Sequence, residues 1–161
     1  MDLLGEVLLS LKVEANSAGI FSLKERWGLD MPHMSENYSL AHCCIDSPFW
    51  VLIENQEPLL LEPGDSVLML HGLPYALASS LEVSRVELQS YWTERGLPHL
   101  APGNRQVAPL TGLELGEGGT VGRMLTLAFL LQAGEGNVLI KALPSVIHLR
   151  GSASGIFPWI S

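Results

Sequence analysis

The sequence of 161 residues is long enough for one domain with a sizeable core, because chains of this length bury roughly two-thirds of their unfolded surface. Hydrophobic residues make up 47% of the chain and charged residues 16%, a composition typical of a folded domain and not of a disordered segment. The net charge of −8 has the wrong sign for binding phosphate groups, and lysine and arginine form no cluster along the chain. We therefore do not expect these residues to bind nucleic acid by themselves.

The sequence also bears on location. No apolar stretch approaches the roughly 20 residues that cross a bilayer, and the N-terminal stretch MDLLGEVLLSLKVEA has acidic residues where a secretory signal carries basic ones. We expect a cytoplasmic protein without membrane attachment.

The first residues have the periodicity of a short helix. Asp2 can cap it, and its apolar positions recur at helical spacing: Leu3, Leu4, Val7, Leu8 and Leu11. Beyond it, the chain consists of short apolar or alternating runs: AGIFSLKERWGLDM, SLAHCCI, FWVLIEN, PLLLEP, SVLML, YALASS, SRVELQSYW, MLTLAFLLQ and VLIKAL. Nearly every gap contains Gly, Pro, Asn, Asp or Ser, and this density of strands and turns predicts an all-β sandwich or barrel.

Two segments between these runs have a specific interpretation. Glu62-Pro63-Gly64-Asp65 fits a type II turn, in which proline presets φ at the second position and glycine accepts a positive φ at the third. The stretch from Thr93 to Gly119 is rich in Gly and Pro and has little periodicity, so it is predicted to be a long loop.

Cys43 and Cys44 are adjacent, so in a strand they point to opposite faces and form no disulfide with each other. The pattern favours two small buried thiols, because free cysteine is among the most buried residue types. A redox-sensing thiol at either position is the alternative.

The strand-turn pattern contains a recognisable motif. Gly64, five residues, Leu70-His71-Gly72, two residues and Tyr75 resemble the second cupin motif, with Leu70 in place of its proline and Tyr75 in place of its metal-binding histidine. Together with LAHCCIDSPFWVLIENQEPLLLEPGDSVLMLHG and ALPSVIHLRGSASGIFPW, the sequence resembles the cupin-type N-terminal domain of AraC-family transcriptional regulators over almost its whole length.

The resemblance implies a cupin double-stranded β-helix, or jelly roll, preceded by the short N-terminal helix. It implies a sensor domain over residues 1–151 and, at 152–161, the start of a linker to a C-terminal helix-turn-helix region. Contact with DNA would be made through that region alone, and an effector would act on the barrel or on a homodimer.

The resemblance implies that a metal site, if present, would consist of three histidines and one glutamate inside the barrel, as in metal-binding cupins. His42 and Cys44 share one face of their strand and could bind a metal, but the glutamate of the first motif is missing and Tyr75 replaces the second-motif histidine. We therefore expect no metal and no other cofactor. Histidines satisfied by hydrogen bonds are favoured, and a residual site of His42, Cys44 and His71 is the alternative.

The sequence thus predicts a non-enzymatic regulatory domain that binds an unknown small-molecule effector at the mouth of the barrel. The candidate binding residues are His42, Trp50, His71 and Tyr75, with ordinary core packing as the alternative for Trp50. Two other functions remain open: a small metal-dependent cupin enzyme, such as a dioxygenase or isomerase, and a thiol-based oxidant sensor that uses Cys43 or Cys44.

Overall fold

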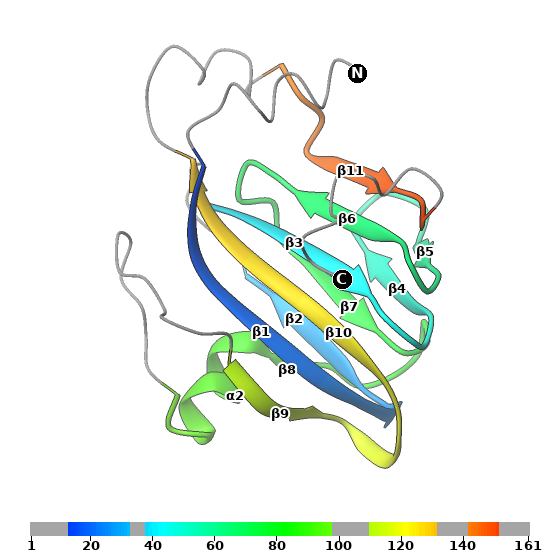
Figure 1. Cartoon of the computed structure of the whole chain (residues 1–161). Coiled ribbons are helices and arrows are strands. Elements are labelled where there is room, and N and C mark those ends of the chain that lie inside the picture. The colour runs from blue at the N-terminus through cyan, green and yellow to red at the C-terminus, as the bar shows by residue number, and fades with distance from the viewer. Residues whose placement is uncertain (1–12, 33–37, 98–109, 132–141, 152–161) are drawn as a thin grey trace.

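The computed structural model describes residues 13–32, 38–97, 110–131 and 142–151 (Figure 1). Short β-strands make up most of it, in agreement with the all-β prediction. The elements are β1 (Val13–Arg26), β2 (Gly28–Met31), β3 (Tyr38–Cys44), β4 (Phe49–Leu52), β5 (Leu59–Leu61), β6 (Ser66–Met69), β7 (Tyr75–Ala78), β8 (Val86–Glu87), α2 (Leu88–Glu94), β9 (Leu110–Leu115), β10 (Glu117–Leu131) and β11 (Val146–Leu149).

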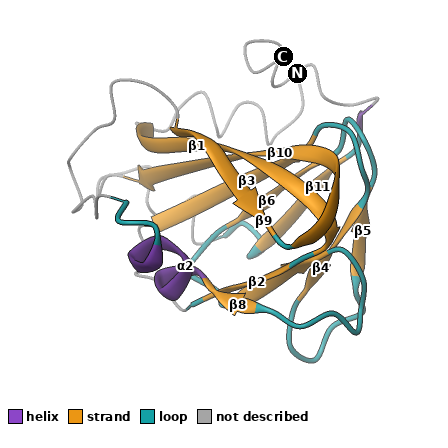
Figure 2. Cartoon of the chain, turned by 90° about the horizontal axis from the view of Figure 1, so that it is seen from below, coloured by secondary structure: helices purple, strands orange, loops and turns teal. Residues whose placement is uncertain are grey.

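The strands form two sheets that lie one above the other, with α2 at one end (Figure 2). The six-stranded sheet has the order β11-β6-β3-β10-β1-β9, and the five-stranded sheet has the order β5-β4-β7-β2-β8. Pairing is antiparallel except where β9 joins β1 and β8 joins β2. Consecutive strands alternate between the sheets in several places, so the architecture is the expected jelly roll.

The core lies between the two sheets because the strands alternate in burial. In β4, Phe49 and Val51 are fully buried whereas Trp50 and Leu52 are half-buried. The other strands, the residues that flank them and the helix supply the rest of the buried cluster: Phe21, Leu23, Trp27, Leu29, Met31, Leu40, Cys44, Ile53, Leu61, Val67, Met69, Tyr75, Leu77, Tyr91, Leu113, Leu115, Met124 and Ala128.

A second, smaller apolar cluster lies on the opposite face of the six-stranded sheet. Ala41 and Leu68 pair across β3 and β6, and Leu127 of β10 and Ile147 of β11 continue the same row. The sheet is therefore apolar on both faces at these strands, unlike an antiparallel sheet with one face in water.

The prediction of a strand over SRVELQSYW was wrong after its first residues. Only Val86–Glu87 is extended, and the helix α2 follows. The physical reason is spacing: Leu88, Tyr91 and Trp92 stand three and four residues apart, so one helical face brings all three against the core.

Among the described residues, no helix has the length and hydropathy that crossing a bilayer requires.

The prediction of an unbroken loop from Thr93 to Gly119 was also wrong. Residues 110–115 form β9, and β10 begins at Glu117. Leu113 and Leu115 are buried on either side of exposed Glu114, a strand alternation that the surrounding glycines conceal. Residues 98–109 lie outside the described part, as do the expected N-terminal helix before Val13 and the expected linker after Gly151.

The predicted type II turn is confirmed. The amide of Asp65 donates a hydrogen bond of 2.8 Å to the carbonyl oxygen of Glu62, and Gly64 has a φ of 93°.

Two glycines near the β9–β10 connection give a matched test of backbone crowding. Gly112 and Gly116 both have positive φ, but a side chain at Gly112 would meet nothing within 4 Å, whereas a Cβ at Gly116 would lie 2.2 Å from the carbonyl oxygen of Arg26. We expect Gly112→Ala to lower the free energy of unfolding by about 1–2 kcal/mol through backbone strain. We expect Gly116→Ala to lower the free energy of unfolding by about 1–3 kcal/mol more, because the backbone at Arg26 must also move away from the new Cβ. Urea unfolding of both variants measures the difference, and equal losses would contradict the crowding at Gly116.

Candidate functional site

A hydrogen-bonded chain of three polar side chains crosses the interior between the sheets. His42 of β3 is opposite Thr126 of β10, and its Nδ1 lies 2.9 Å from the Thr126 hydroxyl oxygen. Its Nε2 lies 2.5 Å from the hydroxyl oxygen of Tyr75, which comes from β7 in the other sheet. The chain therefore links both sheets through the core. Thr126 was not predicted, since its signal is a lone threonine within the apolar run MLTLAFLLQ.

Burial sets the charge state of this chain. His42 is 0% exposed, and burial lowers the pKa of its imidazole to about 3. Burial also raises the pKa of the Tyr75 hydroxyl well above its usual value. Both groups are therefore neutral at neutral pH. They can donate or accept hydrogen bonds, but neither carries a charge.

The interior pair does not fit a metal site. His42 and Tyr75 occupy the positions that correspond to ligands in the cupin motifs, and the structure brings them together. However, the Tyr75 hydroxyl lies 2.5 Å from His42 Nε2 and takes the direction in which a metal would bind that nitrogen at about 2.0–2.1 Å. Among the described residues, no group of three or more His, Cys, Asp or Glu side chains could hold a metal ion.

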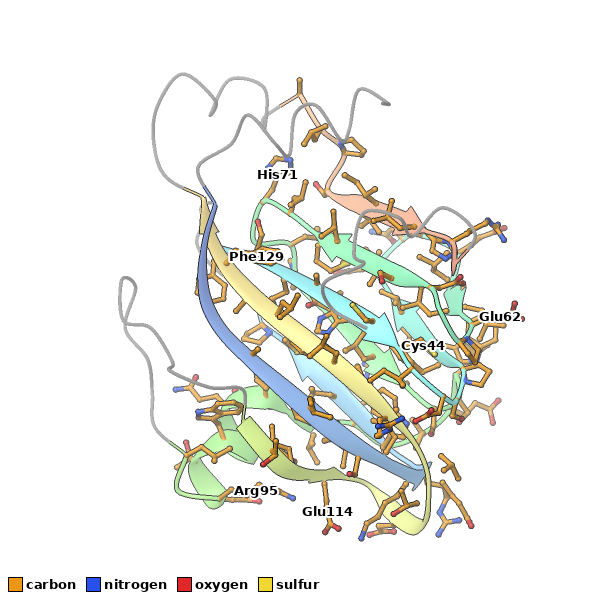
Figure 3. All side chains as sticks on the ribbon, viewed as in Figure 1. Cys44, Glu62, His71, Arg95, Glu114 and Phe129 are labelled. Carbon is orange, nitrogen blue, oxygen red and sulfur yellow. The ribbon has the colours of Figure 1, made fainter. Side chains whose placement is uncertain are left out.

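His71 lies away from the pair and has a structural contact. Figure 3 shows His71 and Cys44 well apart on the molecule. His71 and Gly72 both adopt positive φ in the turn between β6 and β7, and histidine is one of the residue types enriched in that conformation. The His71 Nε2 lies 3.0 Å from the carbonyl oxygen of Leu143, so this ring donates to the segment that precedes β11. The alternative prediction of a residual metal site formed by His42, Cys44 and His71 is therefore wrong.

Trp50 is on the other face of β4 from the core. Its strand neighbours Phe49 and Val51 point between the sheets and are fully buried, whereas Trp50 is half-buried. The structure thus brings together two of the four candidate binding residues, His42 and Tyr75, and leaves Trp50 on the outer face of the five-stranded sheet.

The two thiols are free and buried, as the favoured interpretation predicts. The Cys44 thiol donates to the carbonyl oxygen of Ser47 at 3.1 Å. Burial, reinforced by nearby carboxylates such as Asp65 and Asp46, raises the pKa of Cys44 to about 12. Burial also raises the pKa of Cys43, against a smaller opposite effect of its hydrogen bond with Ser66. Little thiolate forms at neutral pH, and the thiolate is the reactive form.

The stability of the interior chain can be tested at the Tyr75 hydroxyl. Tyr75→Phe leaves a buried ring nitrogen of His42 without a partner, so we expect the free energy of unfolding to fall by about 1–3 kcal/mol. Tyr91→Phe is the matched control, because the Tyr91 hydroxyl donates to the carbonyl oxygen of Glu114, which also accepts a hydrogen bond from Arg95 and so keeps a partner in the variant. The control should lose about 0.5–1.5 kcal/mol. Urea unfolding compares the two, and a larger loss in the control would contradict the interior contact.

The charge state of His42 predicts a dependence of stability on pH. Its folded pKa of about 3 lies below the usual 6.5, so below about pH 6.5 the unfolded chain binds a proton that the folded chain does not. The free energy of unfolding should therefore fall as the pH decreases, with a contribution approaching about 1.4 kcal/mol per pH unit. Urea unfolding between about pH 7.5 and about pH 5 would measure it, with His42→Gln as the variant that lacks this group. Equal slopes in both proteins would contradict a neutral, buried His42.

Comparison with known proteins agrees with this geometry. A family model described as Cupin (Cupin_6) matches residues 2–161, which include the segments that form β3, β7 and β11. No curated protein matches the sequence. The extent of the family match, together with the two-sheet jelly roll, shows that the chain belongs to the cupin family.

Proposed function

We propose that this cupin is the effector-sensing regulatory domain of an AraC-type transcriptional regulator and binds a small molecule inside its barrel. The contact between His42 and Tyr75 is the main support. It is a pair of neutral, buried polar groups at the positions where cupin motifs place their ligand-binding residues. Binding sites in proteins are mostly apolar, with a few polar groups that orient the ligand. The segments that resemble AraC-type domains support the regulatory role.

The composition of the interior favours an uncharged effector. Among the described residues, the buried polar ones are Ser39, His42, Asp65 and Ser66, and no lysine or arginine is buried. A carboxylate or phosphate entering the barrel would lose its hydration without gaining a counter-ion, which is costly. The proposed effector is therefore small and mostly apolar, with one or two hydroxyl or carbonyl groups that exchange hydrogen bonds with His42 and Tyr75.

The filled interior connects binding with regulation. Phe49, Val51, Leu61 and Leu77 are fully buried between the sheets, so a ligand that reaches His42 must separate side chains that are now in contact. A ligand that binds the opened arrangement better than the closed one shifts the protein towards it. In the cytoplasm, this change would act on the barrel or on a homodimer and reach DNA through C-terminal helices.

Two other functions have weaker support. A metal-dependent cupin enzyme needs a full set of metal ligands. Here the first-motif glutamate is missing, Tyr75 replaces the second-motif histidine, and the Tyr75 hydroxyl blocks Nε2 of His42. A thiol-based oxidant sensor needs a thiolate, whereas the environment raises the pKa of Cys43 and Cys44.

A thermal-shift screen tests the proposed site. The library contains uncharged phenols, alcohols and ketones together with carboxylate analogues of the same size. We expect stabilisation by uncharged compounds, and we expect Tyr75→Phe to weaken binding about 5-fold to 150-fold, the equivalent of one lost buried hydrogen bond. Trp50→Phe is the control on the outer face and should leave the affinity unchanged.

Other outcomes contradict the proposal. Ligands that respond to Trp50→Phe and not to Tyr75→Phe would place the effector on the outer face of the five-stranded sheet. About one equivalent of zinc, iron or nickel in the purified protein, lost in His42→Ala, would favour the enzyme. Activation by peroxide that is abolished by Cys44→Ser would favour the oxidant sensor.

A further inference from the structure

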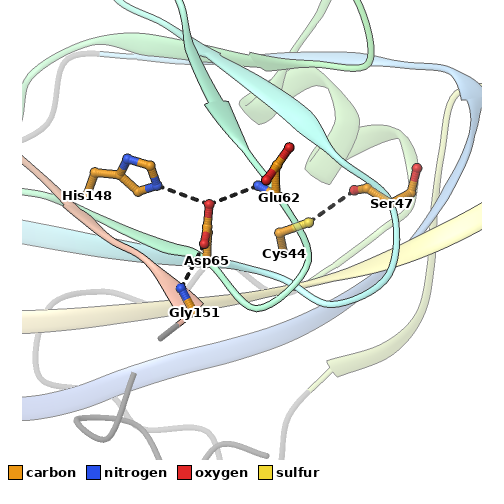
Figure 4. A network of polar contacts seen from close by, with 6 residues as sticks. All are labelled: Cys44, Ser47, Glu62, Asp65, His148 and Gly151. Atoms are coloured by element: carbon orange, nitrogen blue, oxygen red, sulfur yellow. Dashed lines mark hydrogen bonds and ion pairs between the residues drawn. The ribbon is translucent and has the colours of Figure 1, made fainter. Parts of the chain in front are cut away.

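The turn between β5 and β6 meets the last residues of β11 (Figure 4). One carboxylate oxygen of Asp65 accepts a hydrogen bond of 2.8 Å from the amide of Gly151. The other accepts one of 3.0 Å from the amide of Glu62 and lies 3.2 Å from Nε2 of His148. Both oxygens are therefore engaged. Two of the three partners, His148 of β11 and Gly151 just after it, lie more than 80 residues along the chain, as the separations of 83 and 86 show.

The backbones on the two sides of this contact pack directly on one another. A Cβ placed on Gly151 would lie 3.4 Å from the carbonyl carbon of Gly64, and a Cβ on Gly64 would lie 3.6 Å from the Cα of Gly151. No side chain separates the two glycines. The turn and the end of β11 thus fit together closely around Asp65.

The same turn holds the end of β3. The amide of Cys44 donates a hydrogen bond of 2.9 Å to the carbonyl oxygen of Asp65, and the amide of Gly64 donates one of 2.9 Å to the carbonyl oxygen of Cys44. Cys44 stands two residues after His42 on β3, on the same face of the strand. The turn therefore contacts both the strand that carries the interior site and the residues with which β11 ends.

The Asp65 carboxylate stays ionised in this position. Burial by itself would raise its pKa, but the amides of Glu62 and Gly151 and the ring of His148 together outweigh burial and lower the pKa of Asp65 below its usual value. An ionised carboxylate accepts four or so hydrogen bonds and donates none, so it matches a setting that consists of N–H groups.

We propose that the Asp65 carboxylate is a latch that holds the end of β11 and Gly151 against the turn and ties them to the end of β3. The strand β11, Val146–Leu149, is short, and among the described strands it lies at the edge of its sheet and pairs with β6 alone. Short edge strands open locally at low cost, so side-chain contacts at their ends decide how firmly they are held. The inference goes beyond the proposed function and does not require an effector; if the barrel does bind one, the latch offers a route from β3 to the residues after β11.

Hydrogen–deuterium exchange of the full chain tests the latch with Asp65→Asn. The substitution keeps the shape but removes the charge and turns an NH₂ group towards N–H donors, so we expect exchange over residues 146–151 to accelerate about tenfold or more. Exchange over 42–45 should rise with it, and exchange over 18–23 in β1 should stay unchanged. Asp46→Asn is the matched control: Asp46 is exposed, and its carboxylate pairs with Arg123 of β10 at 2.8 Å. It should leave exchange over residues 146–151 as in the unmodified protein.

Each remaining outcome decides against part of the proposal. Unchanged exchange over 146–151 in Asp65→Asn would show that there is no latch, and faster exchange there alone would remove the tie to β3. If Asp65→Asn accelerates exchange in every strand, His148→Gln, which removes one of the three partners, provides the second measurement. Loosening confined to residues 146–151 in that variant supports the latch, and uniform or absent loosening overturns it.

Discussion

The antiparallel pairing of β1 with β10 is the constraint on which the rest of the fold depends. It runs from Val13 opposite Leu131 to Arg26 opposite Glu117 and joins segments roughly a hundred residues apart. The partners on either side, β9 along β1 and β3 along β10, extend the sheet from this pair. Because β10 fixes the register of β3, it also sets Thr126 opposite His42. The position of the interior site therefore follows from the pairing of the two longest strands.

Burial then determines the chemistry that the site can perform. An imidazole with no exposed surface must have hydrogen-bond partners and must remain neutral, and His42 meets both conditions through Thr126 and Tyr75. In this cupin a tyrosine at the second-motif histidine position closes the space beside that imidazole. The result is a pair of neutral hydrogen-bonding groups in an apolar barrel, which suits recognition of an uncharged molecule better than metal chemistry.

The two sequence segments that resemble AraC-type domains, LEPGD and LPSVIHLRG, are neighbours in space. Asp65 from the first segment contacts His148 and Gly151 from the second, and the backbones of Gly64 and Gly151 pack against one another. A single cluster of contacts therefore explains why these residue types occur together. The cluster also joins the end of β3 to the end of β11, so the strand that carries the interior site and the last described residues share one support.

The sequence by itself determined the fold class, the type II turn at Gly64, the buried free thiols and the replacement of a metal ligand by Tyr75, because each depends on local spacing or on one residue's chemistry. It concealed α2, whose short helical spacing resembles the alternation of a strand, and β9, whose alternation is interrupted by glycines. Tertiary structure alone decided that Trp50 faces away from His42, that Thr126 completes the interior chain and that Asp65 holds Gly151. Those contacts join residues tens of positions apart, and their geometry depends on strand register and sheet order, which local patterns do not encode.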